Sequence, residues 1–189
     1  GELQISNLGA IKASEGPGLL DYGVEYSPVA NRDAPPAELD LALPRREQAT
    51  LQRLAAELDL ANQPPAVAAA RVHAFLLGQF RYSLDLPAPA ARLTALETFL
   101  LQTRAGHCEY FATAAALLLR AAGIPARYAT GFSVSEYRAL EGVYVARRRH
   151  AHAWTLIWRD GRWQDFDATP PDWTRVEDEQ SAWWQSIDD

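Results

Sequence analysis

Two hydrophobic periods run along this 189-residue chain, one typical of helices and one typical of strands. Over 45–60, apolar residues recur every three or four positions, which predicts an amphipathic helix. Its apolar face is formed by Leu51, Leu54, Leu58 and Ala55. A second helix is expected over 65–79, where Pro65 suits the first turn. The inward side of that helix is formed by Val67, Val72, Phe75 and Leu76.

Further elements are predicted on either side of these helices. Residues 1–44 are rich in proline and glycine and are expected to be mostly loop, with a strand over 20–26. A short helix is predicted over 94–102, and the apolar run 111–119 indicates a buried helix. From residue 172 onward the chain is acidic and rich in tryptophan. We expect this tail to pack back on the body or to lead to a membrane segment.

The strand period appears over 150–158 and 161–170, where bulky apolar residues alternate with other residues. The dipeptide Asp160-Gly161 between them is a strong signal for a two-residue hairpin turn. Antiparallel pairing about this turn places His152 nearly opposite Asp167, within reach across the two strands. The hairpin is therefore predicted to hold an imidazole beside a carboxylate.

Cys108 is the only cysteine in the chain and stands in Gly106-His107-Cys108-Glu109-Tyr110-Phe111, directly before the buried helix. A lone thiol can form no internal disulfide and no thiolate-rich metal site. At the first turn of a helix, the orphan backbone N–H groups favour the thiolate, which is the nucleophilic form. The alternative is that Cys108 is a small buried hydrophobic residue, as free cysteines often are.

A nucleophile, a base and an orienting acid are thus present in the order Cys108, His152 and Asp167. His152 would take the thiol proton, and Asp167 would fix the tautomer of His152 and stabilise its charge. The thiolate would then attack a carbonyl carbon and form a thioester, which an amine or water releases. The backbone N–H of Cys108 is one natural donor to the oxyanion.

The neighbouring histidines leave alternatives open. His150 lies two positions before His152 on the same strand face, so it is a candidate residue of the substrate cleft or an alternative base. The side chain of His107 is expected to point away from the thiol. Cys108, His150, His152 and Asp167 are also competent zinc ligands, although acyl chemistry accounts better for a cysteine at a helix start.

The stretch 80–171 resembles the core of the transglutaminase-like superfamily, because several similar motifs follow one another in order. The matching segments are 80–84, 98–100, 104–112, 118–127, 130–132, 152–154 and 167–170. The nucleophile, base and acid of that family correspond to Cys108, His152 and Asp167. Many relatives have Trp-Val-Glu after the histidine, whereas Trp154-Thr155-Leu156 occurs in this chain, so a contact made by that glutamate is absent.

This resemblance implies an α+β fold with a papain-like, transglutaminase-like core, in which an active-site helix carrying the cysteine packs against an antiparallel sheet carrying the histidine and the aspartate. It implies a protein-glutamine gamma-glutamyltransferase that uses a protein or peptide glutamine as donor and an amine as acceptor. A peptidase or amidase that hydrolyses the same thioester stays open, as does a binding module without catalysis. No cofactor and no metal are expected, and the sequence has no calcium loop of EF-hand type.

Within the superfamily, the likeness is to large extracytoplasmic domains of bacterial membrane-anchored proteins, for which the form Gly-His-Cys-Glu-Tyr-Phe-Ala is typical. We therefore expect a periplasmic domain of an inner-membrane protein. Three segments are predicted to make one globular unit. They are an N-terminal extension with helices over 1–79, a catalytic core over 80–171 and an acidic tail over 172–189.

Composition narrows the class of partner. The net charge of −6 and the pI near 5.2 argue against nucleic acid as the main partner. Hydrophobic residues make up 48%, which is ample for a packed interior, and no run approaches the roughly 18 apolar residues needed to span a bilayer. Trp154 and Tyr137 are candidate aromatic residues of the substrate cleft, although each suits a hydrophobic core equally well.

Overall fold

A computed structural model describes residues 3–5, 11–13, 34–86, 88–89 and 92–185. The chain divides into two compact units, 1–35 and 36–189. In the first unit, strands β1 (Leu3–Ile5) and β2 (Ile11–Ala13) pair in antiparallel fashion. The strand expected over 20–26 lies outside the described residues.

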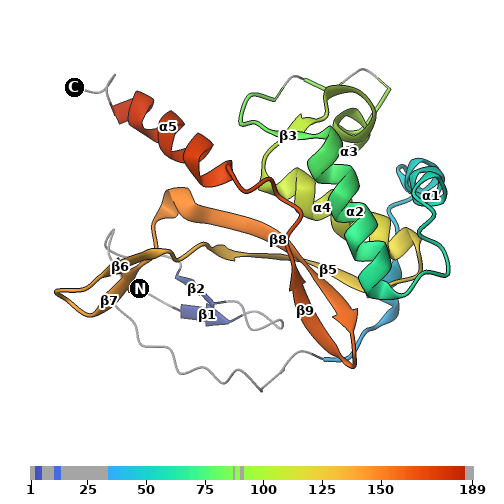
Figure 1. The fold of residues 1–189 in the computed structure, drawn as a ribbon, viewed down its shortest axis with the longest axis horizontal. Coiled ribbons are helices and arrows are strands. Elements are labelled where there is room, and N and C mark those ends of the chain that lie inside the picture. The colour runs from blue at the N-terminus through green and yellow to red at the C-terminus, as the bar shows by residue number, and fades with distance from the viewer. Residues whose placement is uncertain (1–2, 6–10, 14–33, 87, 90–91, 186–189) are drawn as a thin grey trace. The chain divides into compact units, whose positions relative to one another are not determined.

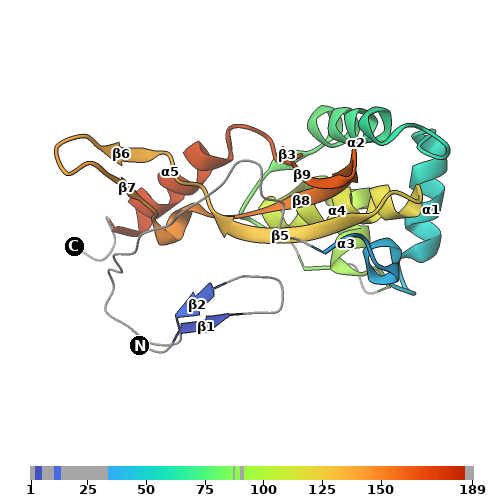
Figure 2. The same ribbon diagram turned by 90° about the horizontal axis from the view of Figure 1, so that it is seen from below.

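The second unit combines helices with short strands (Figure 1, Figure 2). Its helical elements are η1 (Glu38–Leu41), α1 (Gln48–Glu57), α2 (Pro65–Gln79), α3 (Ala95–Thr98), the π-helical turn η2 (Phe99–Thr103), α4 (Cys108–Ala121), η3 (Arg148–His150) and α5 (Trp173–Gln185). Its strands are β3 (Arg81–Tyr82), β4 (Ala105–Gly106), β5 (Ala126–Phe132), β6 (Glu136–Arg138), β7 (Val143–Val145), β8 (Ala151–Arg159) and β9 (Arg162–Phe166).

Helices α1 and α2 follow the apolar pattern of the sequence. The face of α1 that contains Leu51, Leu54 and Ala55 is buried, and α2 begins at Pro65 as predicted. Proline suits this position because the first turn of a helix leaves its N–H groups without intrahelical partners. The inward direction predicted for Val67 is wrong. Its side chain is exposed because the alanines that follow it take the inward positions of this turn.

Helix α4 is the centre of the core. One side packs against β5 and β8, and another packs against α1 and α2 (Figure 1). Its buried side chains are Cys108, Phe111, Ala112, Ala114, Ala115, Ala116, Leu117, Leu118 and Leu119. Burial of each large apolar side chain in this core contributes about 1.5–3 kcal/mol to the free energy of folding. Packing on several sides therefore fixes the axis of α4 and the position of Cys108 at its start.

The central sheet is antiparallel, with the strand order β5-β8-β9. Thr155 lies opposite Phe166, which confirms the register predicted from the turn. Asp160 and Gly161 have φ angles of 55° and 75°, the left-handed backbone that a two-residue type I′ turn needs at both positions. Strand β9 ends at Phe166, so Asp167 begins the segment that leaves the sheet.

A short parallel pair, β3 and β4, brings the start of the core beside the turn before α4. Tyr82 lies opposite Gly106, and the N–H of Ser83 donates to the carbonyl of Gly106 at 3.0 Å. The helix predicted over 94–102 is divided into α3 and the turn η2. Thr94 caps α3, because its hydroxyl accepts a hydrogen bond from the N–H of Glu97 at 3.2 Å.

These elements confirm the predicted α+β fold, in which the cysteine-bearing helix packs on an antiparallel sheet. The boundaries predicted at residues 79 and 171 fall inside the second compact unit. The segment expected to pack back on the body forms α5, which contacts η3.

Candidate active site

Cys108 is the first residue of α4, with His107 as its N-cap. The thiol is free, and the residue is only 7% exposed. Burial alone would raise the pKa of this thiol, but its interactions with His107, His152 and the backbone of Ala153 outweigh burial and lower the pKa to about 6. The positive end of the helix dipole acts in the same direction. Cys108 is therefore a thiolate at neutral pH.

His152 and Asp167 meet where β8 extends beyond the end of β9. The Nε2 atom of His152 lies 2.7 Å from Oδ2 of Asp167, as the predicted register implies. The other carboxylate oxygen, Oδ1, accepts the N–H of Thr169 at 2.9 Å. An aspartate carboxylate that accepts a hydrogen bond from the backbone N–H two residues later forms a turn, so the chain after β9 holds the carboxylate in place.

The second ring nitrogen of His152 is left for the thiol. Nδ1 is buried and has no hydrogen-bond partner in the described part of the chain. The Cys108 thiol lies near enough to the ring to raise the pKa of His152. With Nε2–H directed at Asp167, Nδ1 is the atom that can exchange a proton with Sγ of Cys108.

The charges of this group follow from its contacts. Burial lowers the pKa of His152, but the hydrogen bond to Asp167 and the Cys108 thiol outweigh burial and raise the pKa to about 9. Burial opposes ionisation of Asp167 as well, yet its bonds to His152 and Thr169 keep the pKa of that carboxyl below its usual range. Between about pH 6 and pH 9, Cys108 is negative and His152 is positive.

The prediction that His107 points away from the thiol is wrong. Its imidazole lies near the Cys108 thiol, and this interaction is the main reason that the pKa of His107 is raised. The backbone of His107 is extended, as is usual for an N-cap residue. The ring also lies 5.1 Å from the ring of Tyr110, one turn into α4.

His150 lies apart from the thiol. It ends the turn η3 rather than belonging to the strand, because β8 begins at Ala151. Its residue is buried, and Nε2 lies 3.4 Å from Oδ1 of Asp178 on α5. The structure therefore joins His150 to α5 and shows no contact between His150 and Cys108 among the described residues. The described residues also contain no group of three or more His, Cys, Asp or Glu side chains able to hold a metal ion.

Trp154 lies beside the imidazole. It follows His152 by two positions on the same strand face, and the two rings are nearly parallel, with centroids 6.3 Å apart. The indole N–H donates to Oδ1 of Asp165 at 2.8 Å. The ring lies over Gly131, where a Cβ atom would come within 2.9 Å of it. A glycine is therefore needed at this position of β5 if Trp154 is to stay beside His152.

Tyr137, the other aromatic residue predicted for the cleft, is in β6. It contacts Tyr144 of β7, with ring centroids 4.8 Å apart, and is 54% exposed. In the part of the chain that the structure describes, Tyr137 makes no ring contact or hydrogen bond to His152, Asp167 or Cys108. It is thus neither a core residue nor a neighbour of the reactive groups.

Sequence reasoning missed Trp173 as a residue of this site. Its ring stacks on the imidazole of His152, with centroids 4.3 Å apart and an angle of 11° between the planes. Trp173 is buried and begins α5, directly after the turn that follows Asp167. An aromatic ring over a protonated imidazole stabilises its charge and keeps water from it. The signal in the sequence is the tryptophan-rich tail, which is expected to pack back on the body.

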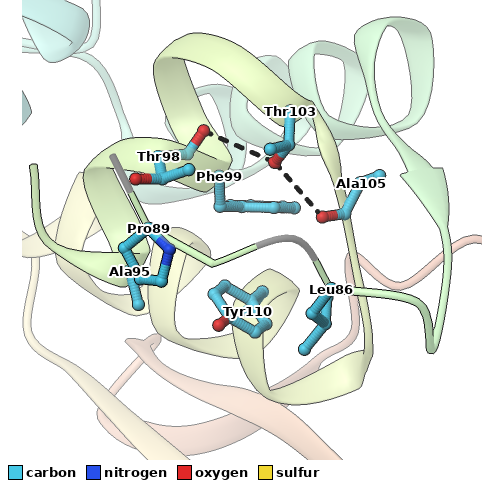
Figure 3. Close-up of a pocket in the computed structure, with 8 residues that line it drawn as sticks. All are labelled: Leu86, Pro89, Ala95, Thr98, Phe99, Thr103, Ala105 and Tyr110. Carbon is cyan, nitrogen blue, oxygen red and sulfur yellow. Dashed lines mark hydrogen bonds between the residues drawn. The ribbon is translucent and has the colours of Figure 1, made fainter. Parts of the chain in front are cut away.

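A pocket beside α3 and η2 is separate from these groups (Figure 3). The rings of Phe99 and Tyr110 line it, and the hydroxyl of Thr103 donates to backbone carbonyls of the same region. Cys108, His152 and Asp167 do not line it. Among the described residues, no helix has the length and apolar character needed to cross a membrane.

Comparison with known proteins identifies the family. Residues 52–168 match the transglutaminase-like superfamily. A Pseudomonas aeruginosa protein named protein-glutamine gamma-glutamyltransferase is 36% identical over 132 residues, which cover 69% of this chain and 20% of that protein. The Bacillus subtilis protein YebA, which is uncharacterized, is 33% identical over 79 residues, covering 39% of this chain and 11% of that protein.

Solved structures are similar to this chain as well. The periplasmic domain of TgpA from Pseudomonas aeruginosa has a TM-score of 0.64 and 31% identity, covering 74% of this chain and 50% of that one. The same domain bound to ethylmercury has a TM-score of 0.59 and 35% identity, covering 73% and 50%. This chain thus spans a fifth of the length of the named Pseudomonas protein and half of the solved domain. With its fold, its ordered motifs and a family match over 52–168, the chain belongs to the transglutaminase-like superfamily.

Proposed function

We propose that this domain is an acyltransferase of the protein-glutamine gamma-glutamyltransferase type, with Cys108 as nucleophile, His152 as general acid and base, and Asp167 as the acid that orients His152. The observation that carries the proposal is the proximity of all three groups. The thiol begins α4, Nδ1 of His152 lies beside it, and Nε2 is 2.7 Å from Asp167. Similarity to a Pseudomonas aeruginosa protein of that name supports glutamine as the acyl donor.

The first half of the reaction forms the thioester. The Cys108 thiolate attacks the side-chain carbonyl carbon of a glutamine, and the π electron pair moves to the oxygen. The backbone N–H of Cys108 donates a hydrogen bond to that oxyanion. When the pair returns, the C–N bond breaks and His152 gives its proton to the nitrogen, which leaves as ammonia. The imidazole is then neutral, and Asp167 keeps its remaining proton on Nε2.

The second half of the reaction transfers the acyl group. A primary amine attacks the thioester carbon, and neutral His152 takes a proton from its nitrogen through Nδ1. The C–S bond breaks, which restores the thiolate and the imidazolium and releases an isopeptide. Water in place of the amine would give glutamate, which is the hydrolase alternative. The site does not distinguish these outcomes, because the thioester is common to both.

The partners and the location belong to the same proposal. The donor is a glutamine of a protein or peptide, and the acceptor is an amine. Similarity to the periplasmic domain of TgpA supports an extracytoplasmic location and a membrane-anchored parent protein. No nucleic acid is proposed as a partner, in line with the net charge of −6.

The test is incubation of the domain with an unfolded glutamine-rich protein and a fluorescent primary amine. We expect covalent fluorescence on the protein and release of ammonia, both absent in Cys108→Ala. Release of ammonia without fluorescent labelling of the protein would show that the domain is a hydrolase rather than a transferase. Fluorescence that persists in Cys108→Ala would contradict the proposed nucleophile.

A further inference from the structure

Tyr82 is a buried titratable residue with no part in the mechanism above. Its residue is 7% exposed. The pairing of β3 with β4 places it opposite Gly106, two positions before Cys108. Its hydroxyl lies close enough to the backbone amide and the thiol of Cys108 for both to affect its pKa. The hydroxyl therefore lies at the start of α4, where the N–H groups of the first turn have no intrahelical partners.

An anionic oxygen already accepts a hydrogen bond from this hydroxyl. The Tyr82 O–H donates to Oε1 of Glu177 on α5, at 2.5 Å. The negative charge of Glu177 also helps to raise the pKa of His107, so this carboxylate lies near enough to the N-cap of α4 to act on it. A carboxylate near a thiolate is unfavourable by charge.

Helix α5 is tied to the same region at two further points. Trp173 stacks on His152, and Asp178 bonds to Arg149 at 2.8 Å and approaches His150 at 3.4 Å. These contacts position Glu177 between them. The carboxylate is therefore held at the start of α4 by its own helix as well as by Tyr82.

We propose that the Tyr82 hydroxyl is the second donor to the oxyanion, beside the backbone N–H of Cys108, and that the Glu177 carboxylate occupies this acceptor position until a substrate carbonyl displaces it. The inference deepens the proposed function and rests on it. It accounts for an acidic side chain that accepts the Tyr82 hydrogen bond, because a carboxylate oxygen resembles the oxyanion in charge and in hydrogen bonding.

The chemistry requires Tyr82 to keep its proton. Burial raises the pKa of its phenol well above the ordinary value, and the bond to Glu177 raises it further. The hydroxyl thus stays a donor throughout the pH range in which Cys108 and His152 form their ion pair. When the thiolate attacks, the carbonyl π pair moves to oxygen, which then accepts two hydrogen bonds. Both bonds weaken again when the pair returns, and no proton leaves Tyr82.

The test compares Tyr82→Phe and Glu177→Ala, with Glu179→Ala as control. Glu179 lies on the same helix, is exposed and pairs with Arg175 at 2.7 Å. Three readouts are needed. They are kcat and KM for amine incorporation into a glutamine-containing protein, the rate of p-nitrophenol release from p-nitrophenyl acetate, and the rate of Cys108 alkylation by iodoacetamide. Alkylation requires the thiolate but forms no oxyanion.

In Tyr82→Phe we expect kcat to fall about 10²- to 10³-fold, the loss typical of removing one oxyanion donor. KM and the alkylation rate should change little, and ester acylation should slow at least about tenfold. Glu177→Ala should raise kcat/KM, because the substrate carbonyl no longer has to displace a carboxylate. Glu179→Ala should behave as wild type.

Two results would overturn the inference. Ester acylation in Tyr82→Phe at the wild-type rate would remove the donor role. A fall of kcat in Glu177→Ala as large as in Tyr82→Phe would mean that Tyr82 merely anchors α5.

The ester assay also separates this inference from the proposed function. If the wild-type domain incorporates no amine into a glutamine-containing protein, but the ester acylates Tyr82→Phe more slowly than wild type, this inference is retained and the proposed function is refuted. A wild-type domain that forms no acyl-enzyme with the ester would contradict both.

Discussion

Replacement of Asp167 by alanine is the perturbation with the most direct structural reason. The carboxylate accepts the Nε2–H of His152 at 2.7 Å and thereby fixes both the tautomer and the orientation of the ring. Without it, Nδ1 and Nε2 become equivalent sites for the proton of a neutral ring. The ring then has no fixed acceptor directed at the thiol, and the imidazolium loses its closest negative partner.

The size of the effect follows from the pKa of His152. It is about 9, against 6.5 for an ordinary histidine. At 1.36 kcal/mol per pH unit, this preference for the imidazolium corresponds to at most about 3 kcal/mol, because the Asp167 side chain is 42% exposed and solvent screens part of the interaction. Asp167 and Cys108 together raise the pKa of His152, and the hydrogen bond to Asp167 makes the larger contribution. Loss of the carboxylate therefore removes roughly 2 kcal/mol, or about 30-fold in rate.

Loss of tautomer control comes in addition. In histidine-based triads, replacing the orienting aspartate lowers kcat by up to about 10⁴-fold. We therefore expect Asp167→Ala to lower kcat for amine incorporation by between about 30-fold and 10⁴-fold. The assay is steady-state transfer of a fluorescent amine, with circular dichroism to check that the fold is kept.

Asp165→Ala is the matched control. Asp165 lies two positions earlier in β9, is exposed, and bonds only to Trp154 at 2.8 Å among the hydrogen bonds of the described residues. We expect a loss of about fivefold at most, since a solvent-exposed hydrogen bond of this kind contributes about 1 kcal/mol. A larger loss in Asp165→Ala than in Asp167→Ala would refute both the register and the role of Asp167.

Three further predictions concern the same framework. The pH profile of kcat/KM should be bell-shaped, rising through about pH 6 as Cys108 loses its proton and falling through about pH 9 as His152 loses its own; a single rise near pH 9 would contradict the ion pair. Trp173→Ala should lower kcat/KM about 3- to 10-fold, because a ring stacked on a cation contributes about 0.5–1.5 kcal/mol, and Trp173→Phe should recover most of it; equal activity in wild type and Trp173→Ala would remove the stacking role. Thr155→Val should lower the free energy of unfolding by about 1 kcal/mol in urea titrations, because the buried Thr155 hydroxyl donates to the Ala112 carbonyl at 3.0 Å; unchanged stability would show that this bond does not help to hold α4 on the sheet.

The sequence could predict those parts of the site that depend on local rules. The pair Asp160-Gly161 dictates a two-residue turn, and the turn sets the register that brings His152 to Asp167. The apolar run after Cys108 could only be buried as a helix, so the thiol had to lie at its start. In each case a short segment determines its own geometry, and the rest of the fold needs only to leave room for it.

Side-chain directions and long-range docking could not be predicted in the same way. The inward turn of the His107 ring depends on an N-cap conformation and on the thiol beside it. Trp173 and Glu177 reach the site because α5 folds back over η3, which no local period indicates. The outward direction of Val67 depends on which small residues the core accepts at the start of α2.

The central claim is that Cys108 is a thiolate held by His152, and the single cysteine of this chain makes that claim directly measurable. The rate of alkylation by iodoacetamide, followed by intact mass between pH 4 and pH 10, reports one sulfur and needs no substrate. The account predicts a half-maximal rate near pH 6, where the pKa of Cys108 lies, and no labelling of Cys108→Ala. A midpoint near that of an ordinary thiol, about 8.5, would contradict it.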